Sequence, residues 1–583
     1  MGGAINQTLE QLALNDKLLP SKPSKGPKAV FPTFDPSYRE FNEEGMSIIY
    51  NEDIPVRDGT KLRGDIFRPL NTTLDGNEKW PIVLAITPFG KQVPSERDQS
   101  KTPPSKEFDA GYDGVYMSKF STFEGSDPAF WTKHGFIYVI VDSRGSFASE
   151  GTRTTLVTPV DALDAYDVIE HLGALRWSNG HIGMIGSSAL GTIQWFAASL
   201  NPPHLSSIIM QDGWTDTYRD IYYKGGIPHL SFVRVLQDVY LSHGNAEKSP
   251  VSDLVSAALQ HPTFDEFWER LDPDVTKITC PIYVISSFGD RGIHCPGSIR
   301  GYLKASAKTK FLELHPYRKW EWQLTPESLE RQLAFFHRTL QGPDQHAAKS
   351  IDYWPAVRLH TTEKHYAGSW RSENEFPLAR TIRSRYYLGN DQQLVTNSGP
   401  RFSNGLVTYE AKTGSVFWQY TFGQPTEITG TSRLHLIISI SEGSDADLFV
   451  TLQKLDRHGN IVFFPYHTYI NDGHVSWGWL RASLRKLDPN PTGDEVAPTF
   501  RKEDQQPLVP GRSVEVDIGL QPTSTLFRTG ETLKVMVQGH DFGEYSPYGP
   551  VYRIPRGGTG CNQGQHSISF EGSYLEVPII PPK

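Results

Sequence analysis

Ser188 lies where an apolar, strand-like run meets a helix-like segment. The run Ile182–Ile185 leads into Gly186, and the helix-like segment leaves from Leu190. A serine on such a sharp turn with small neighbours is typical of a nucleophile elbow, because the turn projects the hydroxyl above the sheet edge. The Ala189 N–H can then donate to an oxyanion, and the helix N-terminus adds a favourable dipole. The spacing Gly-x-Ser-x-x-Gly thus predicts a nucleophilic serine, although Gly-x-Ser-x-Gly is commoner.

An acid and a base for this serine follow later in the chain. Asp290 comes shortly after the apolar run Ile282–Ile285, and His315 directly follows the strand-like segment 310–314. A serine nucleophile needs both partners, and the order Ser, Asp, His with each residue near a strand end suits that need. A turn-capping aspartate and a half-buried histidine would explain Asp290 and His315 equally well.

Two further residues compete for these roles. His294 lies four residues after Asp290 on the same segment and is an alternative base. Asp212 follows the apolar run 207–210 and is an alternative acid. The residue pattern alone does not decide between the pairs.

The elements expected to position these residues alternate between strands and helices. Helical spacing of apolar residues predicts a helix over 160–172. Short apolar runs bounded by turns or helices are typical of a mostly parallel sheet that is buried on both faces. These predicted strands are Ile82–Ile86, Phe136–Val141, Ile182–Ile185, Ser207–Met210, Ile282–Ile285 and Phe311–Leu314. The layout is α/β.

The chain divides into an arm, an α/β body with an insertion, and a C-terminal β domain. Residues 1–45 form the predicted arm, and 46–217 with 275–345 form the α/β body. Helix-like segments at 231–241 and 252–260 predict a helical cap over 218–274. Strand patterning predicts an all-β sandwich over 346–583, with strands at Leu434–Ile440, Leu448–Leu452, Ser513–Ile518 and Thr532–Val537.

Composition excludes several classes of protein. With 583 residues the chain exceeds one compact core, and no apolar run reaches the roughly 20 residues of a membrane-spanning helix. Lys and Arg total 57 against 66 Asp and Glu, and the scattered charges offer no basic surface for nucleic acid. Three separated cysteines and the absence of a secretory signal suggest a soluble cytoplasmic protein. The sequence does not decide whether the protein forms a homodimer.

Several segments in order resemble the family of cocaine esterase and X-prolyl dipeptidyl aminopeptidase. Residues 58–69 are similar to the family's first hairpin, Asp142-Ser143-Arg144-Gly145 to its Asp-x-Arg-Gly signature, and 177–184 to the approach to its elbow. Residues 377–381, 445–450 and 478–483 look like its C-terminal jelly-roll domain. The resemblance implies an α/β-hydrolase core, a helical cap and a jelly roll, with a ligand pocket where the three meet. It implies Ser188 as nucleophile, Asp290 as acid and His315 as base, and no metal or organic cofactor.

Two departures from the family pattern bear on the chemistry. Family members often carry a Pro-Tyr pair whose hydroxyl donates to the oxyanion, whereas this chain has Pro88-Phe89. Loss of one oxyanion donor costs about 10²–10³ in rate. The family segment Gly-Pro-Trp-x-His would place Lys319, rather than a histidine, at the base position.

We therefore expect a serine hydrolase that cleaves an ester, thioester or amide of a small, largely apolar molecule through an acyl-enzyme on Ser188. Trp214, after a strand end, is the best candidate for a pocket wall. The alternative is a non-hydrolytic biosynthetic enzyme (cyclase, acyltransferase or lyase) on the same scaffold, in which Phe89 reflects a smaller need for an oxyanion hole. The Asp445 and Asp447 pair lacks the remaining ligands of a calcium site, so no metal is expected.

Overall fold

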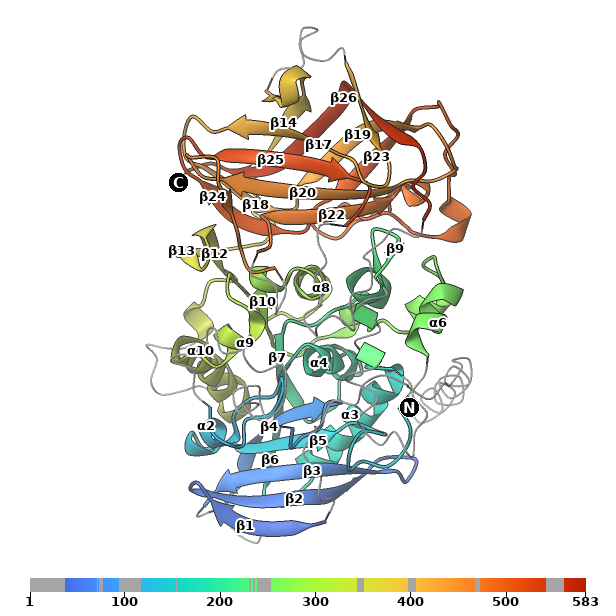
Figure 1. Cartoon of the computed structure of the whole chain (residues 1–583). Coiled ribbons are helices and arrows are strands. Elements are labelled where there is room, and N and C mark those ends of the chain that lie inside the picture. Colours follow the sequence, from blue (N-terminus) through green and yellow to red (C-terminus); the bar gives the residue numbers. More distant parts are fainter. Residues whose placement is uncertain are drawn as a thin grey trace.

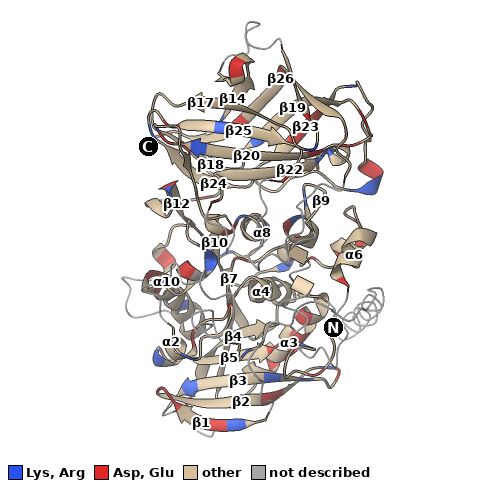
Figure 2. Cartoon of the chain, in the orientation of Figure 1, with Lys and Arg blue, Asp and Glu red and all other residues tan. Residues whose placement is uncertain are grey.

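The structure is a computed structural model that describes residues 37–70, 72, 77–93, 117–153, 155–229, 232–233, 236–237, 253–342, 351–396, 405–466, 472–541 and 560–582. Figure 1 shows two bodies stacked end to end, an α/β body that carries the first strands and a β-rich body that carries the C-terminus. Acidic and basic residues are scattered over both bodies (Figure 2). None of the helices in these ranges is long and apolar enough to cross a membrane.

The α/β body is built on one central sheet. Its spatial order is β1, β2, β3, β5, β4, β6, β7, β10, β11, β12, antiparallel as far as the β3–β5 pair and parallel from β5 onward. The strands are β1 (Arg39–Glu43), β2 (Met46–Pro55), β3 (Lys61–Pro69), β4 (Trp80–Thr87), β5 (Ile137–Asp142), β6 (Ser178–Ser187), β7 (Leu205–Gln211), β10 (Ile282–Ser287), β11 (Lys310–His315) and β12 (Val357–Lys364). All six strands expected from the apolar runs are present.

Helices cover both faces of this sheet. They are α2 (Pro128–Lys133), α3 (Pro159–Gly173), α4 (Ala189–Ser199), α8 (Cys295–Lys304), α9 (Lys319–Gln323) and α10 (Pro326–Phe336). Figure 1 shows α3 and α4 on one side of the strands and α2 and α10 on the other. The parallel strands between them are mostly buried, and all six residues of β5 are buried. Burial on both faces explains why these strands are continuous apolar runs rather than alternating patterns.

Between β7 and β10 the chain leaves the sheet and returns. The described elements of this insertion are the π-helix η3 (Thr217–Tyr222), β8 (Tyr223–Lys224), β9 (Ile227–Pro228), α6 (Leu254–Gln260), α7 (Glu266–Glu269) and η5 (Val275–Lys277). Helix α6 matches the helix expected over 252–260. The helix expected over 231–241 falls mostly outside the described residues.

The C-terminal body contains two antiparallel sheets, one in front of the other in Figure 1. One runs β17 (Ser415–Thr421), β25 (Thr532–Gln538), β20 (Asp447–Leu455), β22 (Ser476–Arg481), with the short β21 (Ile461–Val462) also paired to β20. The other contains β14 (Ile382–Leu388), β16 (Leu406–Glu410), β18 (Thr426–Gly430), β19 (Arg433–Ile440), β23 (Val514–Gly519), β24 (Thr523–Phe527) and β26 (Gln565–Ile580). Strand β19 alternates between buried and half-buried residues, which places one of its faces in the core.

The structure moves two of the expected boundaries. Residues 1–36 of the predicted arm, 1–45, lie outside the described part of the chain. Its residues 39–43 form β1, which pairs with β2. Strand β12 lies beyond residue 345, the predicted end of the α/β body, and yet it pairs with β11 of that body. Thr362 of β12 also pairs with Thr525 of β24. Strand β12 therefore belongs to the central sheet and connects it to the C-terminal body.

Candidate active site

Ser188 occupies a strained turn between β6 and α4. Its backbone has φ 58° and ψ −118°, which L-residues rarely adopt and which is tolerated where surrounding structure enforces it. Gly186 has φ 150°, and a Cβ there would lie 2.5 Å from the Leu190 side chain. A Cβ on Gly191 would lie 2.8 Å from the Gln211 carbonyl oxygen. The two glycines of the motif thus allow helix α4 to start directly behind the serine.

The side chains of Ser188, His294 and Asp290 form a continuous hydrogen-bonded row. Ser188 Oγ lies 3.0 Å from His294 Nε2, and His294 Nδ1 lies 2.8 Å from Asp290 Oδ2. All three residues are buried, with exposed fractions of 7%, 3% and 0%. A hydroxyl next to one imidazole nitrogen, with a carboxylate on the other, is the geometry in which a histidine takes the hydroxyl proton.

The acid and the histidine come from one helical turn. The backbone N–H of His294 donates to the carbonyl of Asp290 at 3.3 Å, and α8 begins at the next residue, Cys295. Side chains four residues apart lie on the same face of such a turn. Ser287 Oγ accepts the Gly289 N–H at 2.8 Å and so caps the short helix η6 (Phe288–Asp290) that leads into it.

The C-terminal body holds this turn in place. Arg291, only 3% exposed, donates from its guanidinium to the His474 carbonyl at 3.0 Å and to Thr523 Oγ1 at 3.3 Å. Gln521 Nε2 donates to the Arg291 carbonyl at 2.6 Å. These contacts lie between Asp290 and His294 in the chain, so the second body fixes the segment that carries both groups.

His315 does not face Ser188. It ends β11, paired in register with Ser287, and its ring stacks on Tyr317 and Trp322 with centroids 6.2 and 5.6 Å away. Its Nδ1 has no hydrogen-bond partner among the described residues. Burial lowers the pKa of His315 to about 3, with His360 adding to the effect, so the ring stays neutral. The histidine beside Ser188 is His294, the alternative that the residue pattern had left open, and the expectation for His315 is corrected.

Asp212 supports the site from behind. Its Oδ1 accepts the Ser287 N–H at 2.8 Å and the Ser286 hydroxyl at 3.2 Å, and its own N–H donates to the Ile285 carbonyl at 2.9 Å. Burial, followed by the charge of Asp290, raises its pKa. Asp212 therefore holds the end of β10, and the carboxylate on His294 is that of Asp290.

A buried ion pair that sequence reasoning did not find lies beside this row. Lys319 Nζ donates to Glu124 Oε1, and the two residues are 4% and 6% exposed. Burial raises the pKa of Glu124, while Lys319 and, more weakly, the Ser188 hydroxyl hold it down. Burial alone would lower the pKa of Lys319, but Glu124 and Asp290 together raise it. The position where the family resemblance placed a histidine thus carries a cation close to Asp290.

The surroundings lower the pKa of His294. Burial is the main cause and the positive charge of Lys319 adds to it, whereas Asp290 opposes both. The Trp214 ring lies next to His294, with ring centroids 6.2 Å apart, and gives this side of the site an apolar wall. A histidine with a lowered pKa is neutral at neutral pH, which is the state that accepts a proton.

Two residues were expected near an oxyanion. Ala189 is the first residue of α4, and N–H groups of a first helical turn have no acceptor inside the helix. Phe89 follows β4; its N–H donates to Thr87 Oγ1 at 3.0 Å and its ring packs edge-on against Phe123, 5.2 Å between centroids. The Ala189 N–H suits an oxyanion donor, while the Phe89 ring brings no hydroxyl and its main-chain N–H already has an acceptor.

Comparison with known proteins matches both bodies. Residues 58–318 match the X-Pro dipeptidyl-peptidase (S15 family), and residues 351–576 match the X-Pro dipeptidyl-peptidase C-terminal non-catalytic domain. A solved CocE/NonD family hydrolase from Staphylococcus aureus is 31% identical, covers 92% of this chain and 94% of its own, and superposes with a TM-score of 0.82. This chain belongs to the CocE/NonD hydrolase family.

More distant relatives of this CocE/NonD hydrolase agree. The cocaine esterase of Rhodococcus sp. is 22% identical over 596 residues, covering 86% of this chain and 92% of the relative. A solved α-amino acid ester hydrolase, 18% identical with a TM-score of 0.66 over 91% of this chain and 96% of its own, shares the fold. The chain is therefore a serine hydrolase with an α/β-hydrolase-like body and a β-rich C-terminal body, and the non-hydrolytic alternative is not favoured.

Proposed function

We propose that this hydrolase cleaves an ester, thioester or amide of a small, largely apolar molecule through an acyl-enzyme on Ser188. The observation that carries the proposal is the row from Ser188 Oγ through His294 to Asp290, with steps of 3.0 and 2.8 Å. The apolar character of the substrate is supported by the Trp214 ring, which lies next to His294.

The first half of the reaction uses His294 as a base. Nε2 takes the proton of the Ser188 hydroxyl as Oγ attacks the substrate carbonyl carbon. The Asp290 carboxylate accepts a hydrogen bond from the Nδ1–H, which fixes the imidazole tautomer and stabilises the imidazolium that forms. The Ala189 N–H donates to the oxyanion. His294 then returns its proton to the leaving alcohol, thiol or amine, and the acyl group stays on Ser188.

The second half reverses the roles. Nε2 of His294 takes a proton from water, whose oxygen attacks the acyl carbon, and the proton passes to Ser188 Oγ as the acid product leaves. Burial and, less strongly, the positive charge of Lys319 keep the pKa of His294 low, so that its neutral form is available for both attacks.

The finer architecture is also proposed. We infer that the insertion over 218–274 acts as a helical cap, supported by η3, α6 and α7 and by the Phe264 N–H, which donates to the Phe500 carbonyl of the C-terminal body at 2.8 Å. We infer a jelly roll for the C-terminal body, supported by its two antiparallel sheets. A substrate pocket enclosed by the cap would shield the site from bulk solvent while admitting the water that hydrolyses the acyl-enzyme.

Hydrolysis of p-nitrophenyl acetate, butyrate and benzoate by the wild type and by Ser188→Ala tests the function. We expect Ser188→Ala to lower kcat/KM by about 10⁴-fold or more, because removal of the nucleophile removes the covalent route. Ser187→Ala is the matched control, since Ser187 is the adjacent buried serine and its Oγ has no hydrogen-bond partner among the described residues. Activity of a folded Ser188→Ala variant within tenfold of the wild type would refute the acyl-enzyme.

A further inference from the structure

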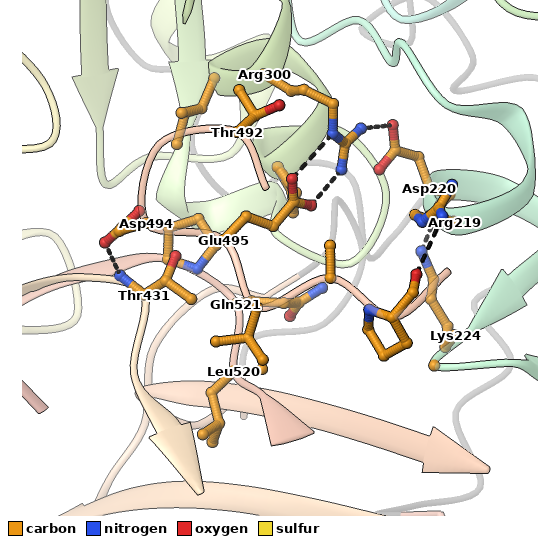
Figure 3. Close-up of a pocket in the computed structure, with 18 of the residues that line it drawn as sticks. Arg219, Asp220, Lys224, Arg300, Thr431, Thr492, Asp494, Glu495, Leu520 and Gln521 are labelled. Atoms are coloured by element: carbon orange, nitrogen blue, oxygen red, sulfur yellow. Dashed lines mark hydrogen bonds and ion pairs between the residues drawn. The ribbon is translucent and has the colours of Figure 1, made fainter. Parts of the chain in front are cut away.

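A cavity of about 140 Å³ lies where α8, the insertion and the C-terminal body meet (Figure 3). Helix α8 and the turn just before it line the cavity with a stripe of residues at helical spacing, Ile293, Pro296, Ile299, Arg300 and Leu303. His294, the residue just before α8, is not among the lining residues and faces Ser188 instead. The cavity is thus distinct from the Ser188 site.

Most of the cavity wall is apolar, and its size fits a small ring. Besides the α8 stripe, the C-terminal body contributes side chains that include Leu480, Val496, Phe500 and Leu520. An apolar cavity of about 150 Å³ is known to hold a benzene molecule. A ligand body of that size would fill the space that these side chains enclose.

The carboxylates that line the cavity all have cationic partners. Arg300 contacts Asp220 at 3.0 Å and Glu495 at 2.6 Å, as the dashed lines of Figure 3 show. The other two carboxylates form ion pairs with arginines that do not line the cavity: Asp494 with Arg383 at 3.0 Å and Asp517 with Arg433 at 2.7 Å. Each of the four carboxylates therefore has an arginine partner, and Asp220 and Glu495 share the single charge of Arg300.

Lys224, at the end of β8, differs from these groups. It is 9% exposed, and its Nζ donates to the main-chain carbonyl of Asp220. Within the described part of the chain, no carboxylate lies at ion-pair distance from this ammonium, which has three N–H donors. Burial lowers the pKa of Lys224 to about 8, against the opposing charge of Asp220, so at neutral pH the group is mostly charged.

We propose that this cavity binds a small carboxylate whose apolar body is about the size of a benzene ring, with Lys224 Nζ donating to the carboxylate. The α8 stripe and the C-terminal side chains enclose the ring. Binding of the carboxylate in this cavity requires neither Ser188 nor hydrolysis, so it is independent of the proposed reaction. A carboxylate also suits the cation chemically, because a hydrogen bond between two ionised groups is stronger than one between neutral groups.

Sodium benzoate and benzamide, titrated calorimetrically into the full-length protein, test the site. We expect benzoate to bind and benzamide, its neutral counterpart of the same shape, to bind at least tenfold more weakly. Lys224→Met should weaken benzoate by tenfold or more, while Lys224→Arg keeps the cation and should stay within about threefold of wild type. Lys119→Met, which removes an exposed lysine paired with Glu43, is the matched control and should change nothing.

A cavity-filling variant keeps the test decisive if Lys224→Met does not fold. Ala497 lines the cavity, and Ala497→Phe should abolish benzoate binding while Ser188→Ala leaves it unchanged. Equal binding of benzoate and benzamide, or benzoate binding that survives Ala497→Phe, would overturn the proposal. So would the absence of benzoate binding to the folded wild type. Loss of binding in Ser188→Ala would place the benzoate at the nucleophile instead and would also overturn it.

Discussion

Asp290 and His294 lie four residues apart on one helical turn, with 2.8 Å between Asp290 Oδ2 and His294 Nδ1. The carboxylate and the imidazole are therefore oriented by local backbone geometry rather than by two separate strand ends. The distance from this turn to Ser188 depends on the wider fold, through β6, β7 and β10 of the central sheet.

Substitution of the acid should disable the reaction without unfolding the protein. Asp290→Asn keeps the shape of the side chain but can present an N–H to His294, which favours the wrong tautomer, and we expect kcat to fall by about 10⁴-fold. Asp212→Asn is the control, because an asparagine Oδ1 still accepts the Ser287 N–H; its kcat should stay within about threefold. Steady-state kinetics measures kcat of the two variants. A larger fall in kcat for Asp212→Asn than for Asp290→Asn would contradict the assignment of Asp290 as the acid.

The acidic limb of the pH profile reports on His294. Protonated His294 cannot accept the Ser188 proton, so kcat/KM should rise with pH through a pKa below the ordinary 6.5 and be complete at neutral pH. Asp290, Lys319 and Lys224 are the charged groups that act on it. Lys319→Met removes a cation that lowers the pKa, so the limb should move to higher pH. A limb that stayed in place, or moved to lower pH, would show that Lys319 does not act on His294.

The buried Glu124 and Lys319 pair should matter for stability as a unit. Lys319→Met leaves the Glu124 carboxylate buried without its partner, which typically costs about 3–5 kcal/mol in the free energy of unfolding. Glu124→Gln combined with Lys319→Met removes both charges and should recover part of that loss. Urea unfolding of the single and double variants measures the difference. If the double variant lost more free energy of unfolding than the two single variants lose in total, the result would argue against direct pairing.

Arg291 should affect the rate although it is not expected to touch the substrate. Arg291→Met removes the contacts to His474 and Thr523, and we expect kcat to fall by about 10–10²-fold as Asp290 and His294 lose their exact placement. Arg512→Met, at an exposed arginine of the same body, is the control and should leave kcat unchanged. Unchanged kcat in folded Arg291→Met would mean that the C-terminal body does not position the turn.

The elbow and the strands were predictable because their signals are local. The run Ile182–Ile185 and the small residues around Ser188 encode the β6 to α4 turn within a few residues, and apolar runs likewise locate the buried parallel strands. His315 is predicted as the base from its position at a strand end. Such a position indicates that the side chain reaches the edge of the sheet, but it does not indicate which neighbour the side chain faces. The spacing of Asp290 and His294, four residues apart just before Pro296, was the available signal, since proline favours a helix start.

Other parts of the site leave no local pattern. Glu124 and Lys319 are 195 residues apart in the chain, and only the packing of the loop before α2 against the start of α9 brings them together. The contact of Arg291 with Thr523 spans 232 residues in the same way. Such pairings depend on how the bodies pack, so one sequence without the fold does not reveal them.

Labelling by a fluorophosphonate probe, followed by intact-mass measurement, tests most directly whether Ser188 is activated by His294. We predict stoichiometric labelling of the wild type and of His315→Ala, and no labelling of Ser188→Ala or His294→Ala under the same conditions, with all four proteins folded. Labelling that survived in His294→Ala but disappeared in His315→Ala would contradict the account and return the role of the base to His315.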